Sequence, residues 1–256
     1  MNSKLTEQEI AILADYRFVY NAESSSFSFR AADLLSKDQL NRILPAIQER
    51  LNAPDLKVTV SILTKRYGFY AVINLFAMSV FNKRINGTIE NVSLHDNGIP
   101  GFTPDIVYRD ISADSLGTER SKGRQEVCQQ TFAEHIYPII VMLSKETALP
   151  ELILWENVAI YIFWLYETLL EKAMDQEVTA RLESDFFYLV HDAPGSIFGN
   201  LHENPLKRYY TEKVLLPERE KMIRIRQTCC FSYKAGTKKM CGGCPRSSLK
   251  KERKIP

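Results

Sequence analysis

The chain has 256 residues, of which 45% are hydrophobic and 25% are charged, so it is neither wholly disordered nor collagen-like. Its formal net charge of +2 conceals a division: residues 205–256 carry 15 Lys and Arg against 4 Glu (+11), whereas the other 204 residues carry 18 basic against 27 acidic side chains (−9). Four of the five cysteines lie in the same basic segment, a distribution too uneven for a disulfide-stapled secreted protein.

The chain shows no sign of a secretory signal or a membrane span. Met1–Ile10 lacks a basic region followed by an apolar stretch. The longest uncharged apolar runs, Phe69–Phe81 and Val158–Tyr166, have 13 and 9 residues, whereas a membrane-spanning helix needs about 20. We therefore expect a cytoplasmic protein whose basic segment makes at most a peripheral contact with the inner face of the cell membrane.

The first third of the chain predicts helices. Thr6–Phe18 is expected to be helical because its first residue and Glu9 have the form of a capping box. Ser36–Leu51 predicts a second helix, with its first residue as N-cap and apolar residues along one face. The strongly apolar stretch Lys57–Phe81 predicts one or two buried helices, with Tyr67-Gly68 as the place of a bend or interruption.

The middle of the chain adds a small β element to a helical body. In residues 86–110, turn residues separate two short β-prone runs, which predicts a hairpin or edge strands. Residues 111–123 predict a polar loop, and the turn-rich residues 191–210 predict a connection. The expected helices of this part are Gly123–Lys145, Pro150–Met174 and Val178–Val190. The fold class is therefore α+β, with a predominantly α-helical body over residues 1–204 and a short C-terminal segment over 205–256.

The cysteines of the C-terminal segment form a compact motif, Cys229-Cys230, ten residues, and Cys241-Gly-Gly-Cys244-Pro. A disulfide between the adjacent pair is disfavoured, because neighbouring Cα atoms lie about 3.8 Å apart and disulfides prefer about 4.4–6.8 Å. Four thiolates suit either a tetrahedral zinc ion or a [2Fe–2S] cluster. Gly242 and Gly243 leave the backbone free to approach closely and to direct N–H groups at sulfur. Spacing alone does not separate zinc from iron–sulfur.

Several stretches resemble the siderophore-iron reductase family, the FhuF-like ferric reductases. The resemblance is carried by Arg226–Tyr233 (RQTCCFSY) with Cys241–Pro245 (CGGCP), and further upstream by Leu154–Asn157 (LWEN) and Phe198–Leu206 (FGNLHENPL). It implies a reductase that, within iron transport, releases Fe(II) from ferric siderophores of the hydroxamate or citrate–hydroxamate type. It also implies a [2Fe–2S] cluster as the cofactor, with four ligands: Cys229, Cys230, Cys241 and Cys244.

Basic residues surround the cysteines in sequence and give a hypothesis about partners. We expect some of them to attract an anionic ferric chelate or an acidic, ferredoxin-like electron donor. A separate donor is implied because the chain has no Gly-x-Gly-x-x-Gly or Walker sequence for a nucleotide or flavin. The candidate residues are Arg224, Arg226, Lys234, Lys238, Lys239 and Arg246.

Other chemistry-bearing residues have simpler interpretations. Cys128 is expected to be a core thiol, and the aromatic side chains at positions 155, 161, 163, 164 and 166 to be core rather than an electron relay. None of the four histidines stands at a ligand offset from the cysteines. Two alternatives remain: a zinc-stabilised basic protein that binds nucleic acid, and an iron–sulfur redox sensor without turnover.

Overall fold

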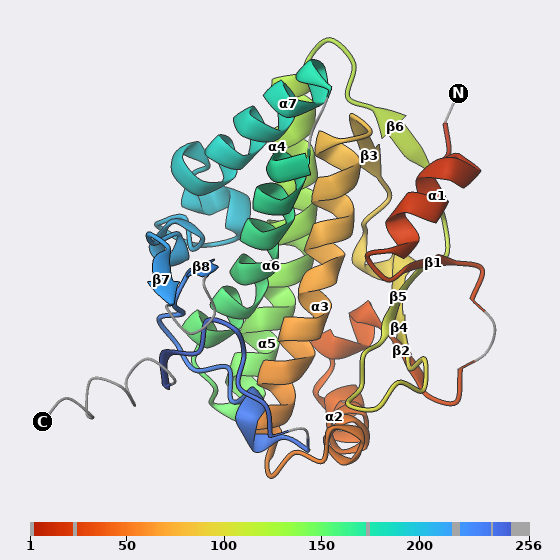
Figure 1. Cartoon of the computed structure of the whole chain (residues 1–256). Helices are drawn as coiled ribbons and strands as arrows, with labels where there is room; N and C mark the ends of the chain where they lie inside the picture. The colour runs from red at the N-terminus through yellow and green to blue at the C-terminus, as the bar shows by residue number, and fades with distance from the viewer. Residues whose placement is uncertain (1–2, 23–24, 173–174, 217–220, 237, 247–256) are drawn as a thin grey trace, which may run out of the picture.

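Two long helices, α3 (Leu56–Ser79) and α6 (Glu151–Lys172), pack along each other through the centre of the molecule (Figure 1). The computed structural model describes residues 3–22, 25–172, 175–216, 221–236 and 238–246. Nearly every residue of α3 from Val58 to Ser79 is buried, as expected of a helix that is apolar on all sides. The fold is α+β and mainly helical, which confirms the predicted class.

Helix α3 runs without interruption through Gly68, so the predicted bend is wrong. A Cβ atom at this glycine would lie 3.1 Å from the ring of Tyr161 and 3.5 Å from the carbonyl oxygen of Asn157, both on α6. The glycine therefore allows α3 and α6 to approach closely. Helix α6 is also the one described helix that is long and apolar enough to span a membrane, and 56% of its most apolar window is buried inside the molecule.

The N-terminal helices begin where the sequence places them. Helix α1 (Glu7–Ala14) starts with the predicted capping box, and Ser36 caps α2 (Lys37–Leu51) by accepting a hydrogen bond from the Gln39 N–H. The predicted extension of the first helix to Phe18 is wrong. After α1 the chain turns at Arg17, whose φ is 66°, and Phe18 begins a strand.

A four-stranded sheet covers one side of α3, away from the C-terminal segment (Figure 1). The expected hairpin is present as antiparallel β4 and β5, with Leu94 opposite Ile106. The sequence did not indicate the two outer strands: β1 pairs parallel to β5, and β2 pairs antiparallel to β4. The predicted polar loop contains β6, which pairs with β3. The strands are β1 (Phe18–Tyr20), β2 (Ser28–Arg30), β3 (Lys83–Ile85), β4 (Val92–His95), β5 (Asp105–Tyr108) and β6 (Ala113–Ser115).

The remaining helices complete the bundle around α3 and α6. The predicted Gly123–Lys145 helix is two helices, α4 (Arg120–Thr131) and α5 (Tyr137–Thr147), joined by a π-helical turn at Phe132–Ile136. Helix α7 (Gln176–Phe187) continues into a second π-helical turn. The chain then passes through short 3₁₀ turns to the hairpin of β7 (Val214–Leu216) and β8 (Lys221–Ile223), which the sequence did not predict.

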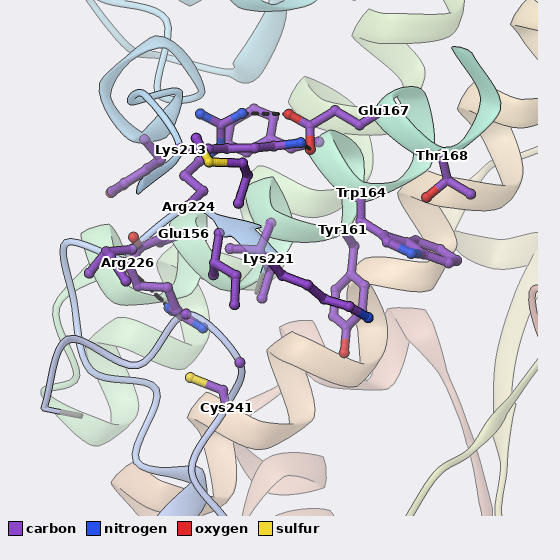
Figure 2. A pocket seen from close by; sticks show the side chains of 18 of the residues that line it. Glu156, Tyr161, Trp164, Glu167, Thr168, Lys213, Lys221, Arg224, Arg226 and Cys241 are labelled. Carbon is purple, nitrogen blue, oxygen red and sulfur yellow. Dashed lines mark hydrogen bonds and ion pairs between the residues drawn. The ribbon is translucent and has the colours of Figure 1, made fainter. Parts of the chain in front are cut away.

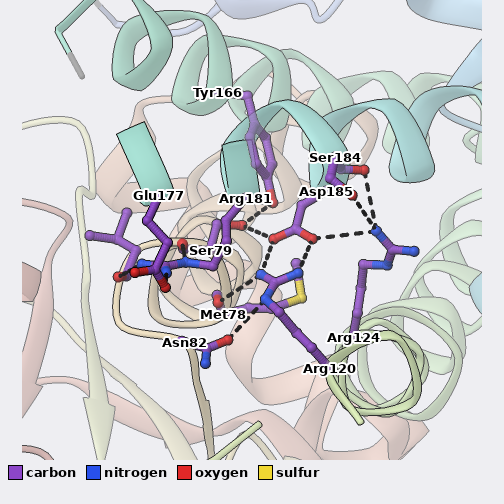
Figure 3. A network of polar contacts seen from close by, with 11 residues as sticks. Met78, Ser79, Asn82, Arg120, Arg124, Tyr166, Glu177, Arg181, Ser184 and Asp185 are labelled. Carbon is purple, nitrogen blue, oxygen red and sulfur yellow. Dashed lines mark hydrogen bonds and ion pairs between the residues drawn. The ribbon is translucent and has the colours of Figure 1, made fainter. Parts of the chain in front are cut away.

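A buried carboxylate ties α7 to α3 and α4 (Figure 3). The Asp185 side chain is fully buried and accepts hydrogen bonds of 2.6 and 2.7 Å from both terminal nitrogens of Arg120. The Ser79 hydroxyl also donates to it over 2.7 Å, and Tyr166 contacts the same hydroxyl. This arrangement satisfies the carboxylate at the crossing of three helices.

We expect Asp185→Asn to lower the free energy of unfolding by about 3–5 kcal/mol, because it removes the fully buried partner of the half-buried Arg120 guanidinium. The measurement is urea unfolding followed by far-UV circular dichroism. The matched control is Glu177→Gln, which removes a neighbouring ion pair whose carboxylate is 83% exposed. The control is expected to change stability by less than about 1 kcal/mol. Equal losses of stability in the two variants would show that the Asp185–Arg120 ion pair does not stabilise the fold in this way.

Candidate functional site

The C-terminal segment that carries the four cysteines lies against the N-terminal half of α3 and the start of α6 (Figure 1). The Ser61 hydroxyl of α3 donates to the backbone oxygen of Cys230 over 2.9 Å. Farther along, the Gly236 N–H donates to the backbone oxygen of Leu51, the last residue of α2. The segment is therefore fixed to the helical body at both of these points. Parts of the predicted basic segment, residues 217–220, 237 and 247–256, lie outside the described residues.

The four predicted ligand cysteines come together and are all free thiols. The thiols of Cys230 and Cys241 share a hydrogen bond, and Cys229 interacts electrostatically with Cys230 and Cys244. Cys230 and Cys244 are buried, and the other two are half-buried. Within the described part of the chain, no three or more His, Cys, Asp or Glu side chains are arranged to hold a single metal ion. The structure thus brings the thiols together without a finished one-ion site.

The environment of Cys230 favours negative charge on its sulfur. The hydrogen bond from Cys241 lowers the pKa of Cys230, and the positive charges of Arg226 and Lys65 add to this effect against the opposing effect of burial. The same hydrogen bond raises the pKa of Cys241, since this thiol is the donor. A thiolate is the form that binds metal.

A backbone N–H close to the cysteine pair donates to a cysteine sulfur. The Phe231 N–H donates to the thiol of Cys229, which opposes the rise in that thiol's pKa caused by burial. Phe231 has a φ of 57°, an uncommon backbone conformation for a bulky residue. Hydrogen bonds from the backbone to sulfur are one way in which proteins adjust the reduction potential of an iron–sulfur centre.

Gly243 allows the two halves of the cysteine motif to join. Its backbone oxygen accepts a 2.9 Å hydrogen bond from the N–H of Arg226. A Cβ atom at this position would lie 2.3 Å from the backbone oxygen of Arg224. The close approach expected of this glycine is therefore present, and it is made to the chain that leads into Cys229 and Cys230.

A buried carboxylate of α6 holds the chain just before the cysteine pair. One oxygen of Glu156 accepts from the Gln227 N–H over 2.6 Å, and the other accepts from the Thr228 N–H over 2.8 Å and from the Thr228 hydroxyl. Arg226 forms an ion pair with the same carboxylate at 3.3 Å, and both side chains are at most 3% exposed. Glu156 therefore fixes the entry into Cys229 and Cys230.

A chain of buried hydrogen bonds continues from this anchor to Cys230. The guanidinium of Arg226 donates to the side-chain oxygen of Asn157 over 2.7 Å, and the Asn157 amide donates to the Ser61 hydroxyl over 3.0 Å. That hydroxyl reaches the backbone of Cys230. One terminal nitrogen of Arg226, Nη1, is buried without a hydrogen-bond partner. A buried unpaired guanidinium N–H is costly, so its surroundings favour an additional acceptor.

A cavity of about 650 Å³ opens beside the cysteines, between α6 and the β7–β8 hairpin (Figure 2). One end is formed by Cys241, Gly242 and Gly243. The walls include Phe69, Tyr161 and Trp164, and the volume is within the range of small-molecule sites. The sequence did not indicate this cavity, because its walls come from three separate parts of the chain.

The six predicted basic residues fall into two groups. Arg224 and Arg226 face the protein, where they form ion pairs with Glu167 at 2.5 Å and Glu156 at 3.3 Å. The other four are exposed around the cysteine motif: Lys234, Lys238, Lys239 and Arg246. Arg246 also donates to the Tyr233 hydroxyl. The exposed group is the one positioned to meet a partner from solution.

The other candidate residues largely follow their predicted interpretations. Cys128 is fully buried, and burial raises its pKa. His135 is also buried, which lowers its pKa to about 3, so it stays neutral in the core. Of the aromatic residues expected in the core, Trp164 differs: it is 43% exposed and lines the cavity.

Comparison with known proteins confirms the family that the sequence resembles. A family model described as "Ferric iron reductase FhuF-like transporter" matches residues 87–214, which is 128 of the 256 residues. The matched range contains Glu156 and Asn157 and ends before Cys229. No curated protein matches the chain.

Proposed function

The chain belongs to the ferric iron reductase FhuF-like family, and we propose that it reduces ferric siderophores with a [2Fe–2S] cluster as its redox centre. In this proposal Cys229, Cys230, Cys241 and Cys244 hold the cluster. The substrate is an oxygen-chelated Fe(III), which gains one electron and leaves its chelator as Fe(II). We further propose that this takes place in the cytoplasm, with at most a peripheral contact with the membrane.

The observation that carries the proposal is the unpaired Arg226 Nη1 beside the gathered thiols. The positive charge of Arg226 acts on both Cys230 and Cys241. A cluster held by four thiolates would be an anionic group, and it would supply the acceptor that this nitrogen lacks. The number, type and burial of the donors therefore fit a [2Fe–2S] cluster.

When bound, such a cluster supplies single electrons and reaches roughly −400 mV in all-cysteine ferredoxins. Residues of the protein would influence how readily the cluster takes up negative charge. Arg226 and Lys65 would favour the more negative, reduced state, and the N–H of Phe231 would do so through Cys229. Glu156 holds the Arg226 guanidinium in place.

The chemistry of the substrate requires a strong reductant. Hydroxamate and carboxylate oxygens are hard donors that prefer Fe(III) to Fe(II). Each tenfold preference for Fe(III) lowers the potential of the chelated iron by about 59 mV for a one-electron step. The electron would come from a separate protein, an acidic ferredoxin-like donor, and the exposed Lys234, Lys238 and Lys239 offer a complementary surface.

The test is anaerobic stopped-flow mixing of the dithionite-reduced protein with a panel of ferric hydroxamate and citrate–hydroxamate chelates. We expect the visible spectrum of the oxidised protein to return as a ferrous-specific dye reports one Fe(II) per electron. A protein that keeps its iron and sulfide but does not react with any chelate would instead be a redox sensor. Stoichiometric zinc and salt-sensitive binding to any DNA duplex would favour the nucleic-acid-binding alternative.

A further inference from the structure

The charges that line the cavity between α6 and the β7–β8 hairpin do not cancel. Glu156 is paired with Arg226, and Glu167 is paired with both Lys213 at 2.8 Å and Arg224 at 2.5 Å. Among the described residues, three lining side chains have no ion-pair partner: Lys65, Lys221 and Glu171. The unpaired groups are therefore two ammonium groups and one carboxylate.

One of the two ammonium groups lies near the cysteines, and the other faces the aromatic wall of the cavity. Lys65 lies one helical turn after Ser61 on α3, and its charge reaches both Cys230 and Cys241. Lys221 extends from β8 across the cavity toward Tyr161 (Figure 2). Glu171 is 15 residues beyond Glu156 on α6, which is about 22 Å along the helix, so the unpaired carboxylate lies at the far end.

The wall opposite the hairpin is aromatic, and Trp164 is its exposed part. The rings of Phe69 and Tyr161 have centroids 4.8 Å apart, and Trp164 lies 6.1 Å from Phe69 with 43% of its surface exposed. Such rings offer flat apolar area to the carbon chains of a ligand at little entropic cost. The cavity thus combines a lysine near Cys241, a second lysine that extends toward Tyr161, and an aromatic wall.

We propose that this cavity binds the ferric chelate and selects chelates that carry free carboxylate groups. The carboxylates would meet Lys65 and Lys221, and the hydrocarbon arms would lie on Tyr161 and Trp164. This places the iron at the end of the cavity formed by Cys241. The inference rests on the proposed function, and it adds the location of the substrate and the charge that the site prefers.

The test measures binding without reduction. Full-length protein with its iron in place is titrated by calorimetry with the Ga(III) complex of a carboxylate-bearing hydroxamate chelator, since Ga(III) mimics Fe(III) but is not reduced. We expect Lys65→Gln/Lys221→Gln to bind about tenfold more weakly, a loss of about 1.4 kcal/mol. The matched control, Lys122→Gln/Lys145→Gln, removes two exposed charges that do not line the cavity and is expected to bind normally.

Two further readouts locate the ligand and test its charge. Binding of the Ga(III) complex should change tryptophan fluorescence by removing water from Trp164, and Trp164→Phe should abolish most of that change because the other tryptophan, Trp155, is only 3% exposed. A Ga(III) complex of a neutral hydroxamate chelator should bind more weakly than the carboxylate-bearing one. Its affinity should not change when Lys65 and Lys221 are replaced.

The outcomes separate this inference from the proposed function. If the lysine double variant binds the carboxylate-bearing complex as tightly as the unaltered protein does, the cavity assignment fails, even where ferric chelates are still reduced. A preference of the unaltered protein for the neutral complex would overturn the charge selectivity in the same way. Lysine-dependent binding without reduction of the Fe(III) complex would support the cavity and overturn the proposed reductase activity.

Discussion

Replacing Cys241 by serine is expected to remove the visible absorption of the protein and its ferric-chelate reduction, both to background. A serine hydroxyl is a harder and more weakly acidic ligand than a thiol, so it does not replace a thiolate on iron. Cys241 is the cysteine that meets both the Cys230 thiol and the cavity, so its loss affects the redox centre and the surface facing the substrate. Anaerobic purification with iron and sulfide analysis measures the result.

The fifth cysteine provides the control for this substitution. Cys128 is fully buried between the bundle helices, away from the cysteine motif, and its raised pKa keeps it a neutral thiol. Cys128→Ala should therefore keep its iron, sulfide and activity, with at most a modest loss of stability from the small cavity. Loss of iron from the Cys128 variant and retention of iron in the Cys241 variant would reverse the assignment of ligands.

Glu156→Gln is expected to produce the second large effect, a protein that folds but loses most of its iron. The neutral amide leaves the Arg226 guanidinium without its counter-charge, and breaking a buried ion pair costs about 3–5 kcal/mol. The substitution also replaces one carboxylate oxygen, which accepts a hydrogen bond from the N–H of Gln227 or Thr228, by an NH₂ group, which can only donate. The residues entering the cysteine pair should then separate from α6.

Glu167→Gln is the matched control on the same helix. Its carboxylate pairs with Lys213 and Arg224, but it is 22% exposed and holds the hairpin rather than the cysteines. Ion pairs in contact with water contribute only about 0–1 kcal/mol, so this variant should retain its iron. Iron per chain and the rate of iron release to a chelator are compared in both variants, with circular dichroism to show that the helices remain. Equal retention of iron by both would contradict the role given to Glu156.

The helical body could be predicted from local signals. The capping box at Thr6 and the N-cap at Ser36 are short-range patterns, and both helices begin where these residues place them. Interactions between distant parts of the chain account for the errors. Gly68 looks like a helix breaker in sequence, yet it lies where α6 crosses α3. Strands β1 and β2 have only three residues each, and they form because they pair with β5 and β4, about 65–90 residues away.

The candidate site likewise has one part that the local sequence predicts and another that depends on contacts between distant residues. The cysteine motif is local, so its four residues could be named from spacing and resemblance. The family-like stretch at Glu156 and Asn157 could be recognised but not given a role, because its partners Arg226 and Ser61 are distant in sequence. The cavity was not foreseen for the same reason. Lys65 in particular lies in an apolar helix, and only the packing of the C-terminal segment onto α3 reveals its position.

The most direct test of the account is chemical analysis of the unaltered protein purified without oxygen. We predict a reddish-brown protein with equal amounts of iron and acid-labile sulfide, whose colour bleaches when dithionite adds one electron per chain. A colourless protein that holds a stoichiometric redox-inactive metal on the same four cysteines would contradict the account.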